Sequence, residues 1–220
     1  MINEEKTYSV VTGDIVSSSR LSNRERKHLY DVMKQGSSEL RQRYPHAVPF
    51  DVDIFRGDSW QFLVSDIPNT LRTALFYRLY IRIQMKNISD TRESIGVGKI
   101  SFIPETRVSE GTGPAYRISG KGLDGLKQTR MSLEFEDNTD FNSYAEILIM
   151  VIDSLVTSLT YKQALGVYGA LQGWPQKDIV ALWDPPISQQ AVSDHLKSAR
   201  WGLLEKSVEY IENNMLQRYE

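Results

Sequence analysis

The segment "VVTGDIVSSSRLSNRER", residues 10–26, decides how the N-terminal half of this chain folds. It begins as an apolar, β-branched run, passes through Gly13 and Asp14 into three serines, and continues as a charged stretch. β-branched residues favour buried strands, whereas serines favour turns and helix starts. The segment therefore predicts a strand over residues 7–13, a turn after Asp14, and a helix over residues 21–44.

A second Gly-Asp pair follows in "DVDIFRGDSWQFLV", residues 51–64. Alternating apolar residues around a short turn that contains Gly57 are typical of a β-hairpin. If this hairpin pairs beside the first strand, Asp14 and Asp58 reach the same edge of one sheet. Two carboxylates without Cys or His partners favour Mg²⁺ or Mn²⁺ carrying nucleotide phosphates. The alternative is that each Asp only forms a turn, which is a common role for Asp after Gly.

Polar residues beside the two Gly-Asp pairs could hold phosphate groups. The serine run offers hydroxyl and backbone N–H donors near a helix start, an arrangement that binds phosphates. Arg20 and Arg56 could add positive charge at the same place. The alternatives are an ordinary serine-rich loop and solvated turn residues. The candidate nucleotide-binding residues from this part of the chain are Ser17, Ser18 and Arg56.

The rest of the chain divides into two parts by element type. Strand and helix patterns alternate as far as the segment "EFEDNTDFNS", and from Asn142 onward only helical patterns follow. We therefore expect an α+β protein with two domains, residues 1–140 and 141–220. Further elements are expected at 69–86 (helix), 93–102 (strand), 113–127 (loop entering a helix), 130–137 (strand) and 188–215 (helix).

The C-terminal part has the rhythm of a helix-turn-helix protein. The short segment "QKDIVALW" is followed by a turn and then by "SQQAVSDHLKSARW", whose polar start resembles a recognition helix. The candidate DNA-binding residues are Ser188, Gln189, Gln190, Ser193 and Lys197. Residues 160–220 contain six Lys or Arg and seven acidic residues, a balance that opposes phosphate binding. Packing or dimerisation by the same helices is the alternative.

Composition excludes several classes of protein. The 220 residues include no cysteine, which excludes disulfides and thiolate metal sites. The net charge of −2 gives no global basic field, so any nucleic-acid contact must be local. The N-terminus lacks the apolar core of a signal peptide, and Asp153 interrupts the longest apolar run. We expect a cytoplasmic protein with no membrane partner.

Four motifs resemble class III nucleotidyl cyclases across residues 7–135: "GDIVSSS", "RGDSWQF", "SIGVGKI" and "GTGPAYRISGKGL". The resemblance implies a ferredoxin-like, nucleotidyl-cyclase-like sheet domain that acts on ATP or GTP and pairs as a homodimer. It also implies metal ligands at Asp14, Asp58 and the carbonyl of Ile15. At the two positions where the family pattern has Asn and Arg, this sequence has Arg117 and Lys121, so the Asn that the family uses is absent.

The chain as a whole resembles the SatD family of bacterial proteins, through "TGDIVSSSR", "RGDSWQ", "AYRISGKGLD" and the helical C-terminal part. That resemblance implies little biochemistry. The expected function is regulation, with a metal–nucleotide-binding N-terminal domain coupled to a helix-turn-helix that binds DNA or a protein partner. The alternatives are an active nucleotidyl cyclase or nucleotidyltransferase, and a module whose Gly-Asp turns are only turns.

Overall fold

The computed structural model describes residues 3, 5–104, 107–137 and 139–219 as an α+β fold with one five-stranded sheet. The sheet order is β2-β3-β1-β4-β5, in which β5 runs parallel to β4 and the other neighbours are antiparallel. The strands are β1 Thr7–Ile15, β2 Asp53–Phe55, β3 Ser59–Val64, β4 Thr91–Lys99 and β5 Met131–Phe135. The helices are α1 Asn23–Arg43, α2 Thr70–Gln84, α3 Pro114–Gly125, α4 Asp140–Ser158, α5 Tyr161–Leu171, α6 Gln176–Ile179, α7 Gln189–Ser198 and α8 Trp201–Tyr219.

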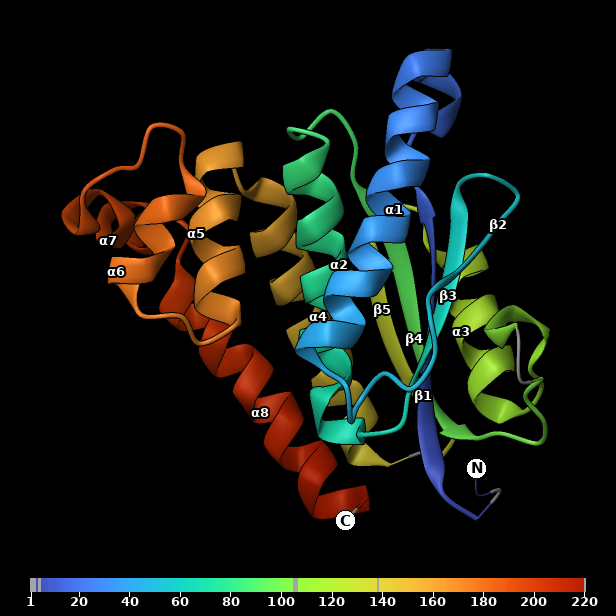
Figure 1. Ribbon diagram of the computed structural model, residues 1–220. Helices are drawn as coiled ribbons and strands as arrows, with labels where there is room; N and C mark the ends of the chain where they lie inside the picture. The colour runs from blue at the N-terminus through green and yellow to red at the C-terminus, as the bar shows by residue number, and fades with distance from the viewer. Residues whose placement is uncertain (1–2, 4, 105–106, 138, 220) are drawn as a thin grey trace.

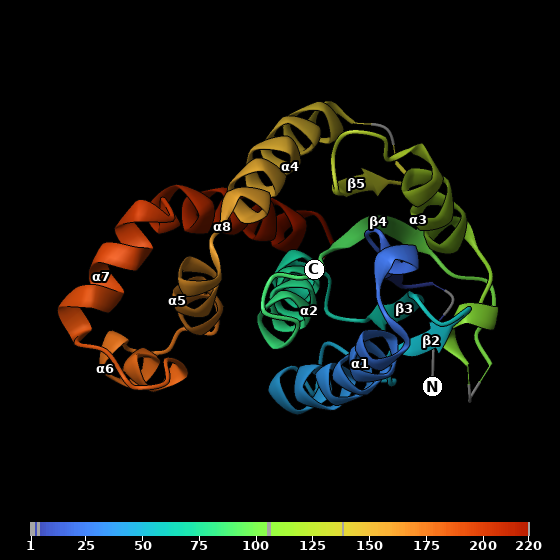
Figure 2. The ribbon, with the colours of Figure 1, turned by 90° about the horizontal axis from the view of Figure 1, so that it is seen from above.

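Helices cover both faces of the sheet. Figures 1 and 2 show α1 and α2 on one face and α3 on the other, with the C-terminal helices beyond α2. Helix α1 begins where predicted, because the Ser22 side chain and Glu25 form a capping box. Its apolar stripe, which includes Leu29 and Met33, is buried against the sheet layer and α2.

The two glycines of the Gly-Asp pairs are needed for different reasons. A Cβ at Gly13 would lie 2.2 Å from the indole of Trp60, so the close approach of this buried ring excludes a side chain. Gly57 instead has φ +85° in the hairpin turn, with open space around it. The first strand also runs two residues further than predicted, so Asp14 lies inside β1 and the chain turns only after Ile15.

Helix α2 is the centre of the molecule. Its residues from Thr70 to Ile83 are buried with the single exception of Arg72, because the sheet and α1 lie on one side and α5 and α8 on the other. One continuous apolar core consequently runs from Val11 in β1 to Met215 in α8. The change from mixed to all-helical structure falls between β5 and α4, and the division into domains at residue 140 stays a prediction.

The helix predicted over residues 188–215 is two helices. Arg200 adopts a left-handed conformation with φ 54°, which ends α7 and redirects the chain into α8. The left-handed residue is an arginine, and the nearby Gly202 lies inside α8, so the sequence pattern did not predict the break. Within the described residues, no helix is long and apolar enough to cross a membrane.

Candidate functional site

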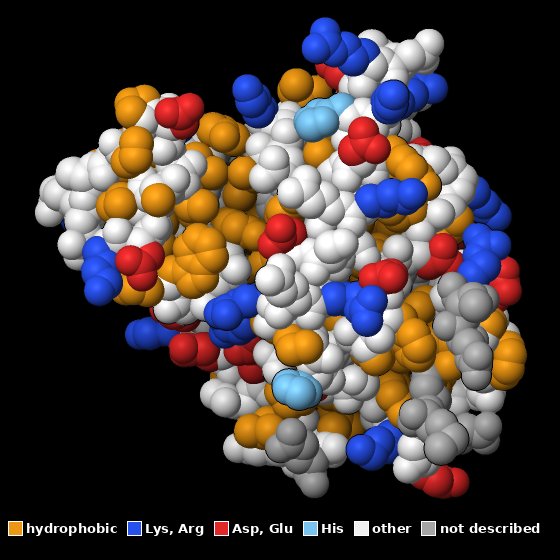
Figure 3. All heavy atoms as spheres, in the orientation of Figure 1, with side chains coloured by type: hydrophobic (Ala, Val, Ile, Leu, Met, Phe, Trp, Pro, Cys, Tyr) orange, Lys and Arg blue, Asp and Glu red, His pale blue; other side chains and the backbone are white. Residues whose placement is uncertain are grey.

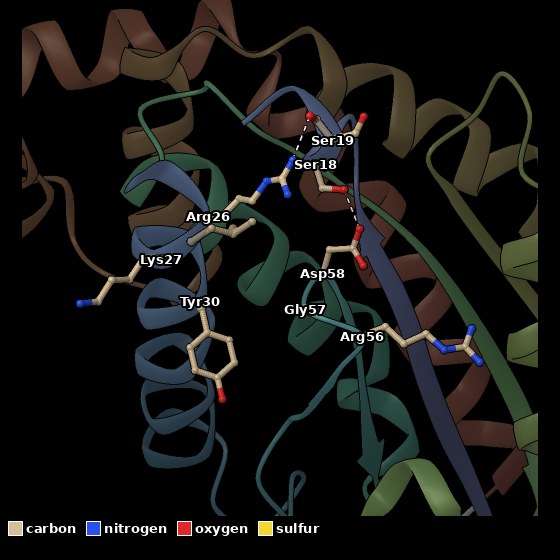
Figure 4. Close-up of a pocket in the computed structure, with 9 residues that line it drawn as sticks. Ser18, Ser19, Arg26, Lys27, Tyr30, Arg56, Gly57 and Asp58 are labelled. Carbon is tan, nitrogen blue, oxygen red and sulfur yellow. Dashed lines mark hydrogen bonds between the residues drawn. The ribbon is translucent and has the colours of Figure 1, made fainter. Parts of the chain in front are cut away.

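The tip of the β2–β3 hairpin brings Asp58 against the serine loop, as Figure 4 shows. Ser18 Oγ donates a hydrogen bond to Asp58 Oδ2 at 2.6 Å. The backbone N–H of Ile15 donates to the Asp58 carbonyl at 3.0 Å, which fixes the hairpin tip to the end of β1. The hairpin pairs beside the first strand as predicted, and two of the candidate residues thereby come into contact.

A cleft of about 550 Å³ opens between this hairpin tip and α1. It contains three candidate residues and several that the sequence reasoning missed. In Figure 4, Lys27 and Arg56 extend away from the centre of the cleft on opposite sides, whereas Ser18 and Asp58 point toward each other. The lining residues are Ser18, Ser19, Arg26, Lys27, Leu29, Tyr30, Arg56, Gly57 and Asp58.

Arg26 fixes the wall of the cleft that the serines form. Its Nε donates to the Leu21 carbonyl at 3.0 Å, and its Nη2 donates to the Ser19 carbonyl at 3.0 Å. The side chain is nevertheless exposed, so it adds positive charge to the cleft. Helical spacing could have identified it, since Arg26 and Tyr30 lie one turn apart beside the buried position Leu29.

The surface around this cleft is locally basic although the whole chain is slightly acidic. Figure 3 shows Lys and Arg side chains gathered at the end of the molecule where α1 begins. Exposed cations at this end of the fold are Arg20, Arg24, Arg26, Lys27 and Arg56. A local field of this sign attracts anionic ligands.

The other aspartate, Asp14, forms an ion pair and faces the opposite layer. Arg92 donates from Nε to Asp14 Oδ1 at 2.9 Å and from Nη2 to Asp14 Oδ2 at 2.5 Å. The Arg92 Nη1 group also donates to the Leu126 carbonyl, which ties the pair to the end of α3. The hydrogen bonds to Asp14 are the main cause that raises the pKa of the Arg92 guanidinium. Asp14 shares its sheet face with Thr12, which hydrogen-bonds Ser119 of α3 at 2.9 Å.

The carboxylates of Asp14 and Asp58 do not fit a metal ion in this arrangement, because other groups occupy their oxygens. Both oxygens of Asp14 accept from Arg92, and an oxygen of Asp58 accepts from Ser18. Within the described ranges, no group of three or more His, Cys, Asp or Glu side chains could hold an ion. A metal ion at Asp14 would have to displace a bidentate guanidinium, so the Mg²⁺ or Mn²⁺ site stays a prediction.

The remaining nucleotide-binding candidates lie outside this cleft. Ser17 is exposed, has φ 57°, and lines a separate cleft on the other side of the serine loop. Arg117 and Lys121 are exposed on α3, whose inner side packs against the sheet through Ala115 and Ser119. The structure therefore brings Ser18, Arg56 and Asp58 together and leaves Ser17, Arg117 and Lys121 elsewhere.

The candidate DNA-binding residues lie at the start and along one side of α7. Ser188 caps the helix, because its Oγ accepts from the Ala191 N–H at 3.2 Å. Gln190 Nε2 donates to Asp194 Oδ1 at 3.2 Å, so part of its hydrogen-bonding capacity is used within the helix. Gln189 and Lys197 are exposed and Ser193 is half-buried. Contact with DNA stays a prediction.

Comparisons with known proteins give structural similarity alone. No protein-family model matches the chain, and no curated protein matches it. Four chains of solved structures match, among them the crystal structure of the guanylyl cyclase Cya2. That match has a TM-score of 0.42 and 13% identity over 56% of this chain and 71% of the other. A similarity this weak carries no weight for function, and the resemblance to the SatD family rests on the sequence motifs alone.

Proposed function

We propose that the cleft between the β2–β3 hairpin and α1 binds a nucleotide of the ATP or GTP class, and that the protein is a nucleotide-responsive regulator. One observation carries this proposal. Ser18 and Asp58, which sequence reasoning selected from separate motifs, are in contact in a cleft that Arg26 also lines, and Lys27 and Arg56 lie at its two sides. Phosphate groups are held in proteins by such charge-assisted and hydroxyl hydrogen bonds.

The lining residues also suit the rest of a nucleotide. Small-molecule sites occupy roughly 300–1,000 Å³, and this cleft of about 550 Å³ lies within that range. The Tyr30 ring is exposed on the α1 wall. Lys34 Nζ lies 4.7 Å from the ring centroid over one face, so a base can stack on the other face or displace the Lys34 side chain. The Asp58 carboxylate can accept a hydrogen bond from a sugar hydroxyl if the Ser18 hydroxyl gives up its own hydrogen bond to Asp58.

Calorimetric titration with ATP, GTP and inorganic phosphate, each with and without Mn²⁺, tests the proposal. We compare two matched double variants, and each of them removes two exposed cations. Lys27→Gln/Arg56→Gln alters the hairpin cleft, and Arg117→Gln/Lys121→Gln alters α3. The proposal requires Lys27 or Arg56 to turn inward onto the phosphates when the nucleotide binds. Because a hydrogen bond to a charged group contributes about 1.5–3 kcal/mol, losing one such contact should weaken nucleotide binding at least about tenfold in the first variant. Binding by the second variant should match the wild type.

If the α3 variant loses nucleotide binding and the hairpin-cleft variant keeps it, the site lies on α3, as the cyclase resemblance implies. If neither ATP nor GTP binds to the wild type, the proposal is rejected. The Mn²⁺ arm tests the predicted metal site. A strict requirement for Mn²⁺ would mean that Asp14 exchanges Arg92 for an ion. Analysis of the same mixtures for cyclic products tests the alternative of an active cyclase or nucleotidyltransferase.

The proposal also covers the type of fold of the first domain and the binding partners of the protein. The strand order β2-β3-β1-β4, with α1 and α2 on one face, supports a ferredoxin-like arrangement for the first domain.

The exposed polar start of α7 is the surface that we propose for DNA or a protein partner. The near-zero charge of this region favours a protein partner over DNA. Dimerisation is part of the same proposal, and light scattering tests it.

A further inference from the structure

A second cleft, of about 450 Å³, lies on the other side of the serine loop from the first. The loop contributes Ser17 and Arg20, and the connection between α2 and β4 forms the facing wall. Its composition is polar and rich in arginine. The lining residues are Val16, Ser17, Arg20, Leu21, Glu25, Arg82, Asn87, Ile88, Ser89, Asp90, Arg130 and Thr157.

Arg82 is a buried cation in this cleft that no carboxylate hydrogen-bonds. Only 5% of the residue is exposed, and its two terminal nitrogens donate to the carbonyls of Val156 and Leu159. The nearest carboxylate oxygen, on Asp90, is 3.8 Å away. Burial, and then the positive charges of Arg78 and Arg130, lower the pKa of Arg82, and Asp90 offsets this only in part. The ion pair of Arg82 with Asp90 is therefore long, and Asp90 shares its charge with Arg78 and Arg130, so an anion close to Arg82 would stabilise this buried cation.

The neighbouring carboxylates are occupied by other arginines. Asp90 accepts two hydrogen bonds from Arg78 at 3.1 Å, one from Arg130 at 2.5 Å, and one from the Thr91 N–H at 2.8 Å. Asp153 accepts from Arg78 Nη1 at 2.8 Å and from the Arg130 N–H at 2.7 Å. Asp90 thus pairs with Arg82 only at 3.8 Å, and the hydrogen bonds of both carboxylates described here go to groups other than Arg82.

Positive charge exceeds negative charge around the cleft. Burial in the same cluster raises the pKa of Glu93 to about 8, so this carboxyl is mostly neutral at pH 7. The acids that line the cleft are Asp90 and Glu25, and Glu25 is engaged in the capping box of α1. They face three arginines in the lining, at positions 20, 82 and 130. A single bound anion would balance this excess.

Hydrogen-bond donors for such an anion are present. Ser89 is 4% exposed and lines the cleft, and its Oγ has no hydrogen-bond partner among the described residues. Arg20 is exposed at the mouth, and its side chain forms no hydrogen bond or ion pair within the described part of the chain. A buried hydroxyl without a partner costs free energy, which a bound ligand recovers.

We infer that this second cleft binds a phosphate group, either as inorganic phosphate or as part of a phosphate ester, between Arg20, Arg82 and Ser89. The guanidinium groups supply charge and the Ser89 hydroxyl supplies a short donor, which is the chemistry that proteins use for phosphate oxygens. This site is separate from the proposed nucleotide site. The two clefts have no lining residue in common: the serine loop separates them, with Ser17 in one and Ser18 in the other, and the first turn of α1 contributes different residues to each.

The test is a thermal-unfolding titration of the full chain with inorganic phosphate against chloride, at equal ionic strength and pH 7. We expect a saturable rise in Tm, roughly 5–10 °C at 100 times the Kd. Ser89→Ala and Arg20→Ala should each raise the phosphate Kd at least about tenfold, because each removes a hydrogen bond to a charged group. A phosphate ester such as glycerol phosphate distinguishes an ester ligand from the free ion.

The Lys27→Gln/Arg56→Gln variant is the matched control, because it removes two cations from the first cleft only. It should keep the full phosphate response even if it loses nucleotide binding. The inference is overturned if the wild type gives no saturable response, if Ser89→Ala and Arg20→Ala respond like the wild type, or if the control variant loses the response. Because nucleotide binding is measured separately, the two proposals can fail independently.

Discussion

Glu93 is a buried carboxyl whose surroundings favour its neutral form. It lies on β4 opposite Gly13, is fully buried, and neither of its oxygens has a hydrogen-bond partner among the described residues. Burial raises its pKa to about 8, and the nearby charges of Asp90 and Asp153 add to this effect against the opposing effect of Arg78. In the unfolded chain the same group ionises near pH 4.5.

Glu93→Gln should therefore remove a pH dependence of stability. Between about pH 4.5 and 8 the folded wild type keeps a proton that the unfolded chain has lost. Its free energy of unfolding consequently falls with rising pH, by up to about 1.4 kcal/mol per pH unit from this group. The variant lacks this contribution, so its stability relative to the wild type should rise steadily from pH 5 to pH 8. Urea unfolding at four pH values measures the difference.

Glu134→Gln on the neighbouring strand β5 is the control, since Glu134 is exposed. Its stability should follow that of the wild type at every pH. A constant difference between Glu93→Gln and the wild type across this range would mean that Glu93 is ionised in the folded protein.

At the residue scale the sequence predicted part of the site. Asp58 was selected as a metal ligand and Ser18 as a phosphate-binding residue; the structure brings the two into contact, and both roles stay predictions. The Asp14–Arg92 pair was not predicted, because it depends on which residues face each other between β1 and β4. Arg26 and Lys27 were also missed, although the helical spacing of α1 could have identified Arg26, and the Arg82 cluster was missed because only tertiary packing brings it together.

At the scale of elements, an ion-pair network attaches the C-terminal helices to the sheet layer. Arg78 of α2, which is fully buried, bridges Asp90 before β4 and Asp153 of α4. Thr157, one turn after Asp153, accepts from Arg78 at 2.9 Å. The network explains why the apolar run of α4 is interrupted by Asp153. Asp153 stabilises the contact between helices α4 and α2 through its ion pair with Arg78.

Asp153→Ala should destabilise the protein by about 3–5 kcal/mol, because it leaves Arg78 buried with one partner fewer and removes the acceptor of the Arg130 N–H. Urea unfolding at pH 7 measures this cost. Asp140→Ala, which removes an exposed carboxylate at the start of the same helix, should cost no more than about 1 kcal/mol. Equal effects of the two substitutions would show that the network contributes little.

Element types were predicted better than element ends. The capping box and the hairpin turn are local signals, so α1 and the β2–β3 pair were predicted from the sequence. The break between α7 and α8 depends on the left-handed conformation of Arg200, which has no local sequence signal. Local sequence patterns likewise did not predict the central position of α2, because helices far along the chain bury it on nearly all sides.

At the scale of the whole molecule, the serine loop lies between two clefts of different character. The first combines hydroxyls, cations and the Tyr30 ring, and the second combines buried arginines with a serine hydroxyl that has no partner among the described residues. The helices that could transmit a response pack on α2, within the same continuous core as the sheet. The serine loop and the surface of α7 are thus connected through one continuous apolar core.

The measurement that tests the nucleotide proposal most directly is an amide NMR titration of the ¹⁵N-labelled protein with ATP and with GTP. The account predicts that the largest shifts occur at Ser18, Ser19 and Gly57, whose backbones border the first cleft. Amides of α3, including Arg117, should move little. Shifts centred on α3, or no saturable shift with either nucleotide, would contradict the assignment of this cleft as a nucleotide site.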